Sequence, residues 1–223
     1  MTVKLFFQAI AKFLLGLVLI GLLLFLPAGS LQYWNAWLFL GILFIPMFAA
    51  GIMMMCKNPE LLKKRLNAKE EESKQKAVLA LSGIMFLAAF VVAGLNFRFQ
   101  WIVLPAWAVW VGAGVFLAAY LMYAEVLREN TYLSRTIEVQ ENQKVVDTGL
   151  YGIVRHPMYS ATLFLFLSMG IVLGSPISFA ILLLYIPIIA LRMKNEEKVL
   201  EKGLAGYKEY KSRVKYKVIP FIW

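Results

Sequence analysis

The residues best placed to do chemistry lie where a polar loop runs directly into an apolar stretch. The loop covers residues 149–156 and ends in Arg155 and His156, the only histidine of the chain. Pro157 is expected to begin a helix, because the N–H that proline lacks would have no partner in a first helical turn. Arg155, His156 and free backbone N–H groups there would attract a carboxylate or a phosphate. The alternative is that Arg155 binds lipid headgroups and His156 only caps the helix.

A second group of charged residues follows the last apolar stretch. Arg192 and Glu196 are four residues apart and share one face of a predicted helix, and Glu197 is the next residue. Such a pair can hold a polar ligand. The same spacing is also typical of an ordinary surface ion pair, which contributes roughly a few tenths of a kcal/mol. The spacing alone leaves both interpretations open.

Long apolar runs must position these residues. Hydrophobic residues make up 61% of the 223-residue chain, which is typical of a polytopic membrane protein. Crossing a bilayer takes about 20 residues, and four runs approach or exceed that length: 5–26, 33–55, 77–95 and 101–124. For the first run, a cleaved signal peptide is the alternative.

Two further apolar runs are shorter. They cover 157–173 and 177–191 and meet at Gly174-Ser175-Pro176, which predicts a short helical hairpin. We therefore expect an all-α fold, a polytopic membrane helical bundle with about six apolar segments and a cytosolic cofactor-binding layer. It forms a single domain over 1–223, with four transmembrane helices in 1–124 and a catalytic region in 125–223.

Local patterns give three further predictions. Residues 96–100 separate the third and fourth runs, so they should form a tight connection between antiparallel helices. In the charged segment 57–76, helical spacing predicts an amphipathic helix on the membrane surface. In the tail, one buried helical face is predicted. The amphipathic pattern is carried by Leu61, Leu62, Arg65, Leu66 and Lys69, and the buried face by Leu200, Leu204 and Tyr207.

The distribution of charge predicts the orientation. If the spans alternate, 22 of the 23 Lys and Arg residues and all 13 acidic residues lie on one side, and Arg98 alone lies on the other. This bias places both termini and the polar site in the cytosol. The net charge of +10 then reflects loops that face anionic membrane lipids. Nucleic acid is not an expected partner, since neither a basic soluble domain nor a recognition motif is visible.

Several function classes are disfavoured. Ionisable residues are almost missing from the spans apart from Lys12, which argues against an ion or proton pathway. Cys56 is the only cysteine, so we expect neither an intramolecular disulfide nor a metal site. The usual nucleotide-binding motifs are not found. An enzyme that takes one substrate from the lipid and one from the cytosol fits what remains.

Taken together, these residues resemble the isoprenylcysteine carboxyl methyltransferases and the related phospholipid N-methyltransferases, integral membrane enzymes that use S-adenosylmethionine. The resemblance covers roughly residues 140–220. It is carried by Gly149-x-Tyr151-x-x-x-Arg155-His156-Pro157-x-Tyr159, Arg192-x-x-x-Glu196-Glu197-x-x-Leu200, Gly206-Tyr207-x-x-Tyr210 and Pro220.

The resemblance implies a cofactor pocket on the cytosolic side of the last hairpin and catalytic roles for Arg192 and Arg155. Where the prenylcysteine enzymes carry His-x-Leu-Val, this chain has Gln143-Lys144-Val145-Val146, in which the glutamine can hydrogen-bond but cannot titrate. The implied cofactor-binding residues are Gln143, Val145, Val146, Tyr151, His156, Pro157, Met158, Tyr159, Glu196 and Glu197.

The acceptor of the methyl group remains open at this point. Methyl transfer from a sulfonium is a direct displacement that needs alignment and exclusion of water. Arg192 could orient a carboxylate acceptor, whereas an amine or a thiol must lose a proton, for which His156, the only histidine, is the candidate base. A phospholipid amine or small-thiol methyltransferase is the alternative. Two further alternatives are an NADPH-dependent enzyme similar to the membrane sterol reductases and a non-catalytic scaffold.

Overall fold

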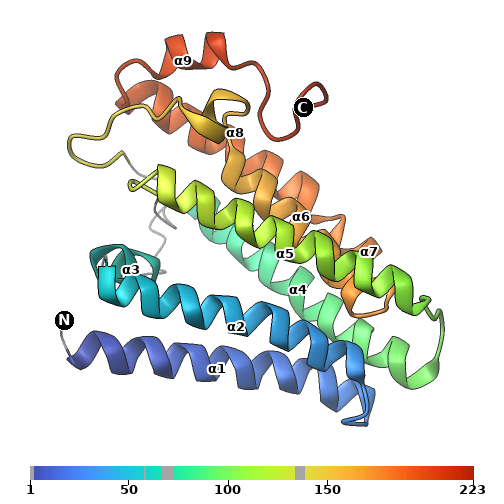
Figure 1. The fold of residues 1–223 in the computed structure, drawn as a ribbon. Helices are drawn as coiled ribbons and strands as arrows, with labels where there is room; N and C mark the ends of the chain where they lie inside the picture. Colours follow the sequence, from blue (N-terminus) through green and yellow to red (C-terminus); the bar gives the residue numbers. More distant parts are fainter. Residues whose placement is uncertain (1–2, 58, 67–72, 134–138) are drawn as a thin grey trace.

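The computed structural model describes residues 3–57, 59–66, 73–133 and 139–223 (Figure 1). Within these ranges the secondary structure is helical throughout and contains no strand, which confirms the all-α prediction. The α-helices are α1 (Val3–Ala28), α2 (Trp34–Lys57), α3 (Pro59–Leu66), α4 (Ser73–Phe99), α5 (Ala106–Glu129), α6 (Pro157–Val172), α7 (Pro176–Leu182), α8 (Tyr185–Gly203) and α9 (Tyr207–Arg213), and a 3₁₀ turn, η1, covers Gly149–Gly152.

Five helical stretches in the described part of the chain are long and apolar enough to cross a membrane, consistent with an integral membrane protein. Helix α6 is also apolar but has only 16 residues. The prediction of about six apolar segments thus corresponds to five long spans and one shorter helix. The spans are Leu5–Ala28, Trp34–Lys57, Lys76–Phe99, Ala106–Glu129 and Pro176–Gly203.

The connection between α4 and α5 differs from the prediction. Helix α4 continues to Phe99, and α5 begins only after Pro105, so the connection is residues 100–105 and not 96–100. The side chain of Asn96 explains the shift: its Nδ2 donates to the carbonyl of Ile102 at 2.9 Å and its Oδ1 accepts from the N–H of Ile102 at 3.2 Å. A polar side chain that we assigned to the loop is therefore the buried helical residue that folds the loop back.

The last hairpin turns where predicted but has a longer second arm. Gly174 adopts a left-handed φ of 68°, and the Ser175 hydroxyl accepts from the N–H of Ser178 to cap α7. Helix α7 is followed after two residues by α8, which continues far beyond the predicted end at Leu191. Arg192, Glu196 and Glu197 are thereby carried on the same helix that begins with the apolar Tyr185–Leu191 stretch.

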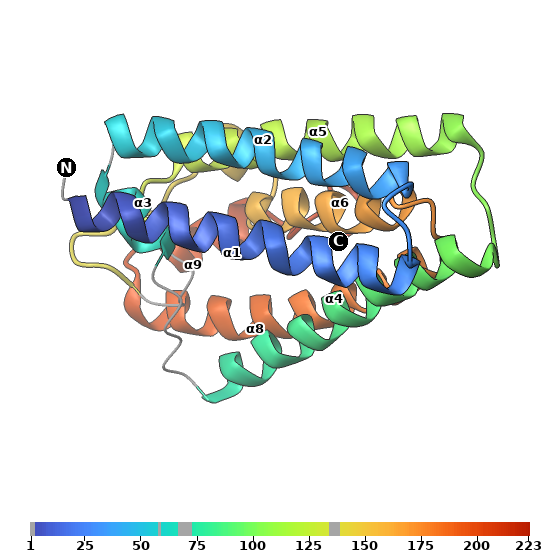
Figure 2. The same ribbon diagram turned by 90° about the horizontal axis from the view of Figure 1, so that it is seen from below.

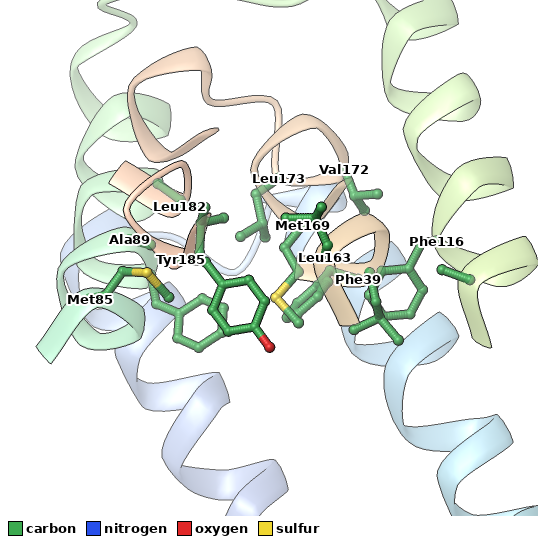
Figure 3. Close-up of a cluster of buried hydrophobic side chains, with 14 of the residues drawn as sticks. Phe39, Met85, Ala89, Phe116, Leu163, Met169, Val172, Leu173, Leu182 and Tyr185 are labelled. Atoms are coloured by element: carbon green, nitrogen blue, oxygen red, sulfur yellow. The ribbon is translucent and has the colours of Figure 1, made fainter. Parts of the chain in front are cut away.

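The helices pack along one another with their connections at two ends (Figures 1 and 2). The N-terminus, α3, the residues that follow α5, and α9 lie toward one end, and the turns after α1, α4 and α6 lie toward the other. The main core joins α2, α4, α5 and α6 to α7 and α8. Figure 3 shows Phe39, Met85, Phe116 and Met169 within it, and the rings of Phe39 and Phe116 meet edge to face with centroids 5.9 Å apart.

A helix is present at residues 59–66, within the segment where one was predicted, while Lys69 lies outside the described residues. Leu62 is buried, as the apolar face of such a helix should be. The ammonium of Lys12, the one cation well inside the first apolar run, donates to the carbonyl of Leu66 at the end of α3 (2.6 Å). A cation at a helix C-terminus is favourable, so α3 gives Lys12 a partner.

The crossing of α1 and α4 depends on Gly94. A Cβ at this position would lie 2.5 Å from the carbonyl oxygen of Leu24 and 3.0 Å from the backbone nitrogen of Ala28. Both atoms are backbone, so relief requires the two helices to separate.

We therefore expect Gly94→Val to lower the free energy of unfolding in detergent by about 1–3 kcal/mol, because overpacking at a backbone contact forces the helices apart. Gly21→Ala in α1 is the matched control, since nothing lies within 4 Å of its added Cβ. Equal thermal stability of the two variants would contradict the close crossing.

Candidate active site

A cavity of about 480 Å³ lies between α4, α6 and α8, and residues 130–133, residues 143–146 and α9 also line it. Its volume is in the range of small-molecule sites, roughly 300–1,000 Å³. Pro157 and Glu197 are not on its wall. The predicted site residues that do line it are Gln143, Val145, Val146, Tyr151, Arg155, His156, Met158, Tyr159, Arg192 and Glu196.

The position of Tyr151 is set by the end of α5. The Glu129 carboxylate accepts from the Thr148 hydroxyl (2.8 Å) and from the N–H of Leu150 (3.3 Å). Gly149 has a left-handed φ of 48°, which favours glycine, and a Cβ there would meet the Glu129 carboxylate, which would have to shift. The Tyr151 hydroxyl then accepts from Asn130 Nδ2 at 3.0 Å, which holds the ring on the cavity wall.

The start of α6 is as predicted, but its backbone donors are not all free. His156 is the N-cap residue and Pro157 the first helical residue. The N–H groups of Arg155 and His156 donate to the carbonyls of Tyr216 (2.9 Å) and Lys217 (2.8 Å). The C-terminal segment lies alongside the loop and accepts from both N–H groups, so these two donors just before the helix are already engaged.

The Glu197 side chain faces away from the cavity and contacts Arg155, His156 and Lys211. Its Oε1 accepts from Arg155 Nε at 2.9 Å and lies 3.2 Å from His156 Nε2, and its Oε2 is 3.1 Å from Lys211 Nζ. Arg155 Nη1 also donates to the carbonyls of Val214 (2.7 Å) and Lys215 (2.8 Å). Arg155, His156 and Glu197 are buried, so this network ties together the loop before α6, helix α8 and the tail.

Glu196, the neighbouring residue, faces the cavity. Its Oε2 accepts a 2.6 Å hydrogen bond from the hydroxyl of Tyr159, and that hydroxyl accepts from Arg192 Nε at 2.9 Å. Arg192 and Glu196, for which an exposed surface pair was the alternative, are therefore half-buried on the cavity wall and linked through Tyr159.

The segment upstream of the loop contributes a turn and an apolar wall. Gln143 closes the turn: its N–H donates to the carbonyl of Gln140 (3.1 Å) and its Oε1 accepts from the N–H of Gln140 (2.9 Å). Val145 packs against the tail cluster around Leu204 and Tyr207. Gln143 therefore lines the cavity with its side-chain oxygen already engaged in the local fold.

The other end of the cavity lies between apolar helices. Thr162 Oγ1 and the Tyr185 hydroxyl are 2.9 Å apart there, and the ring of Phe166 packs edge to face on Tyr185 and on Phe86. We missed Thr162 and Tyr185 because they sit inside apolar runs. The available signal was spacing, since Thr162 lies three residues after Tyr159 and Tyr185 seven residues before Arg192.

The tail does not form the continuous helix that was predicted. Helix α8 ends at Gly203, and Gly206 has a φ of 81°, so the chain turns before α9 begins at Tyr207. Leu200, Leu204 and Tyr207 still pack in one cluster. Tyr207 lines the cavity, and its buried hydroxyl has no hydrogen-bond partner in the described structure. Among all the described residues, no group of three or more His, Cys, Asp or Glu side chains is arranged to hold a metal ion.

Part of the sequence matches a known protein family. Residues 107–206 match the family model described as phospholipid methyltransferase. Over this stretch the chain is similar to a family of integral membrane methyltransferases. The matched region runs from α5 to the turn before α9 and contains all the predicted site residues. The match confirms the resemblance to the phospholipid methyltransferases, and it begins earlier than residue 140 and ends before Tyr207. No curated protein matches the chain.

The ion pairs of Glu197 predict how much this residue contributes to the free energy of unfolding. Glu197→Ala leaves Arg155 and Lys211 without their shared carboxylate, so we expect the free energy of unfolding to fall by about 3–5 kcal/mol, as for other broken buried ion pairs. Glu201→Ala is the control, because Glu201 pairs with the same Lys211 but is one-third exposed, and its loss should cost less than about 1 kcal/mol. Thermal unfolding in detergent measures both; equal losses would contradict the central position of Glu197.

Proposed function

We propose that the chain is an S-adenosylmethionine-dependent methyltransferase that modifies a lipophilic acceptor taken from the membrane. The observation that supports this most strongly is the cavity itself. Ten residues chosen for cofactor and substrate contact from separate parts of the sequence line one space within a methyltransferase domain. The family match favours methyl transfer over the reductase and scaffold interpretations.

The residues present suit this cofactor. The Glu196 carboxylate on the wall can accept hydrogen bonds from an ammonium or from ribose hydroxyls, and the rings of Tyr151 and Tyr159 offer aromatic surface for an adenine. When bound, S-adenosylmethionine supplies an electrophilic methyl group on a sulfonium. Binding at the Tyr151–Glu196 end would leave the Thr162–Phe166 end for the acceptor.

The side chains contribute mainly alignment. The Tyr159 hydroxyl is held between Glu196 and Arg192, so it keeps the cofactor side and the acceptor side of the cavity in a defined geometry. Arg155 acts as a positioning residue, since it secures the loop and the tail through Glu197, Val214 and Lys215. Apolar walls from α4 and α6 would exclude water from the transfer.

Arg192 supports a carboxylate as the first candidate for the acceptor. Its guanidinium is suited to orient an anionic group, so a carboxylate acceptor of the isoprenylcysteine type needs no further base. A phospholipid amine is the second candidate because the matched family is described by that activity. That acceptor must lose a proton, and His156, which lines the cavity beside Glu197, is the residue suited to take it.

We place the site and both termini in the cytosol. Two observations support this: the bias of Lys and Arg to one side of the spans, and the gathering of α3, the segment after α5 and α9 toward one end of the bundle (Figures 1 and 2). The cofactor would then enter from water and the acceptor from the lipid.

The cofactor site is tested by Glu196→Ala. Removing a carboxylate that accepts charge-assisted hydrogen bonds should weaken binding of S-adenosylhomocysteine at least tenfold, measured by isothermal titration. Tyr159→Ala should have the same effect because Glu196 loses its 2.6 Å partner. Glu201→Ala on the same helix is the control, since Glu201 is not on the cavity wall. Wild-type affinity in Glu196→Ala and Tyr159→Ala would refute the site assignment.

The acceptor side is tested by Arg192→Ala. We expect transfer of labelled methyl groups from S-adenosylmethionine to membrane lipid extract to fall at least tenfold, while the affinity for S-adenosylhomocysteine changes less than threefold. Arg213→Ala, which removes a half-exposed pair with Asp147, is the control. If affinity fell and turnover of the saturated enzyme did not, Arg192 would belong to the cofactor site instead.

A further inference from the structure

The turn at residues 219–222 presents two large apolar side chains outward. Phe221 is 86% exposed and Ile222 is 80% exposed, which are the highest fractions among the large hydrophobic residues that the structure describes. Their neighbours do the opposite: Val218 is 1% exposed within the main core, and Ile219 and Trp223 pack against that core. One set of apolar residues therefore fixes the tail to the bundle, while a second set points away from it.

The backbone of this turn is strained at Phe221. The N–H of Ile222 donates to the carbonyl of Ile219 at 3.2 Å, and Phe221 has a φ of 65°. A turn with proline second, here Pro220, and a positive φ third normally carries glycine or asparagine in the third place. A bulky residue there costs free energy. The Phe221 ring recovers little of it within the protein, since it meets only the edge of a core-distant ring, that of Tyr216, with centroids 5.2 Å apart. The compensating contact is therefore expected outside the chain.

The turn lies at the depth of a membrane boundary. The Ser160 hydroxyl donates to the Val218 carbonyl at 2.6 Å, so the tail is attached to the first turn of α6. With 16 residues at 1.5 Å each, α6 is about 24 Å long, which is shorter than a hydrocarbon core of about 30 Å. Its far end lies with the turns after α1 and α4, so its first turn lies below the opposite membrane surface. In both views the C-terminus is level with α6 along the bundle, whereas the N-terminus and α3 lie at the end (Figures 1 and 2).

The surroundings of the turn match a lipid surface. Phe164 lies four residues after Ser160 and so on the same face of α6, and it is 44% exposed. The chain just before the turn is basic: Lys215 is exposed and Lys217 half-exposed, and neither takes part in an ion pair within the described part of the chain. Apolar side chains beside free ammonium groups are typical of segments that bind an anionic membrane surface.

We propose that the turn 219–222 is a membrane-binding tip. Phe221 and Ile222 insert below the headgroups of the leaflet on the side of α3 and α9, and Lys215 and Lys217 contact anionic headgroups. The inference does not depend on which cofactor or acceptor the cavity binds. It gives the tail a second attachment: carbonyls of the same segment accept from the N–H groups before α6, so the loop that borders the cavity is secured to the bilayer as well as to the bundle.

The test places a fluorophore at Ile222. Because Cys56 is the only cysteine, Ile222→Cys in a Cys56→Ser background gives a single labelling position. The labelled protein is reconstituted in vesicles of phosphatidylcholine and phosphatidylglycerol, and quenching by lipids with a nitroxide on the upper acyl chain is compared with quenching by aqueous iodide. Leu121→Cys, at a lipid-facing position of α5, and Ser212→Cys, at an exposed position of α9, give the lipid and water limits.

We expect the ratio of nitroxide to iodide quenching at Ile222 to exceed that at Ser212 at least about twofold, because interfacial segments bury their apolar face roughly 5–10 Å deep. Phe221→Gly is the matched variant: glycine suits a φ of 65°, so the turn is retained while the ring is lost. The ratio at Ile222 should then fall toward the Ser212 value. It should also fall in vesicles of phosphatidylcholine alone, which offer the two lysines no anionic headgroup.

A label at Ile222 that is quenched like the label at Ser212 would overturn the proposal, as would a ratio that Phe221→Gly leaves unchanged. Protection of the label from both quenchers would assign the turn to a protein partner, such as a second copy of the chain, instead of to lipid. Equal ratios in neutral and anionic vesicles would refute the contact of Lys215 and Lys217 with headgroups.

Discussion

The buried ion pair between Arg155 and Glu197 is the constraint on which the site depends. Two charges in a low-dielectric interior are stable only when nearly all their hydrogen-bonding groups are matched. Here the matching groups come from three parts of the chain: His156 in the loop before α6, Lys211 in α9, and the carbonyls of Val214 and Lys215. Satisfying the pair therefore requires loop, helix and tail to assemble together, and the cavity lies among these segments and α4.

Two adjacent acidic residues on α8, Glu196 and Glu197, have different surroundings. Successive residues of a helix point about 100° apart, so Glu196 and Glu197 cannot serve the same space. Glu197 faces the tail and is matched by cations, whereas Glu196 faces the cavity beside Tyr159. The acidic pair thus has one carboxylate in a buried ion-pair network and one on the cavity wall. Because α8 is a single helix from Tyr185 to Gly203, the apolar end of the cavity and its polar end are held in a fixed relation.

Much of this arrangement could be predicted from local sequence. Long apolar runs indicated the spans, Pro157 marked the start of α6, and the motif around Tyr151, Arg155 and Glu196 indicated the family. What could not be predicted depends on contacts between distant residues. The extension of α4 depends on Asn96, which folds the loop back at Ile102. The N–H groups of Arg155 and His156 are engaged by carbonyls of the tail, at Tyr216 and Lys217. Periodicity predicted that Tyr207 is buried, but it cannot show that its hydroxyl lacks a partner within the described residues.

The central claim is that this cavity binds S-adenosylmethionine, and titration of the purified wild-type protein tests it most directly. S-adenosylhomocysteine and NADPH are titrated in parallel under the same detergent conditions. Saturable binding of S-adenosylhomocysteine with no binding of NADPH is the result that the structure and the family predict. Binding of NADPH alone would assign the same cavity to a reductase, and absence of both would contradict a cofactor site.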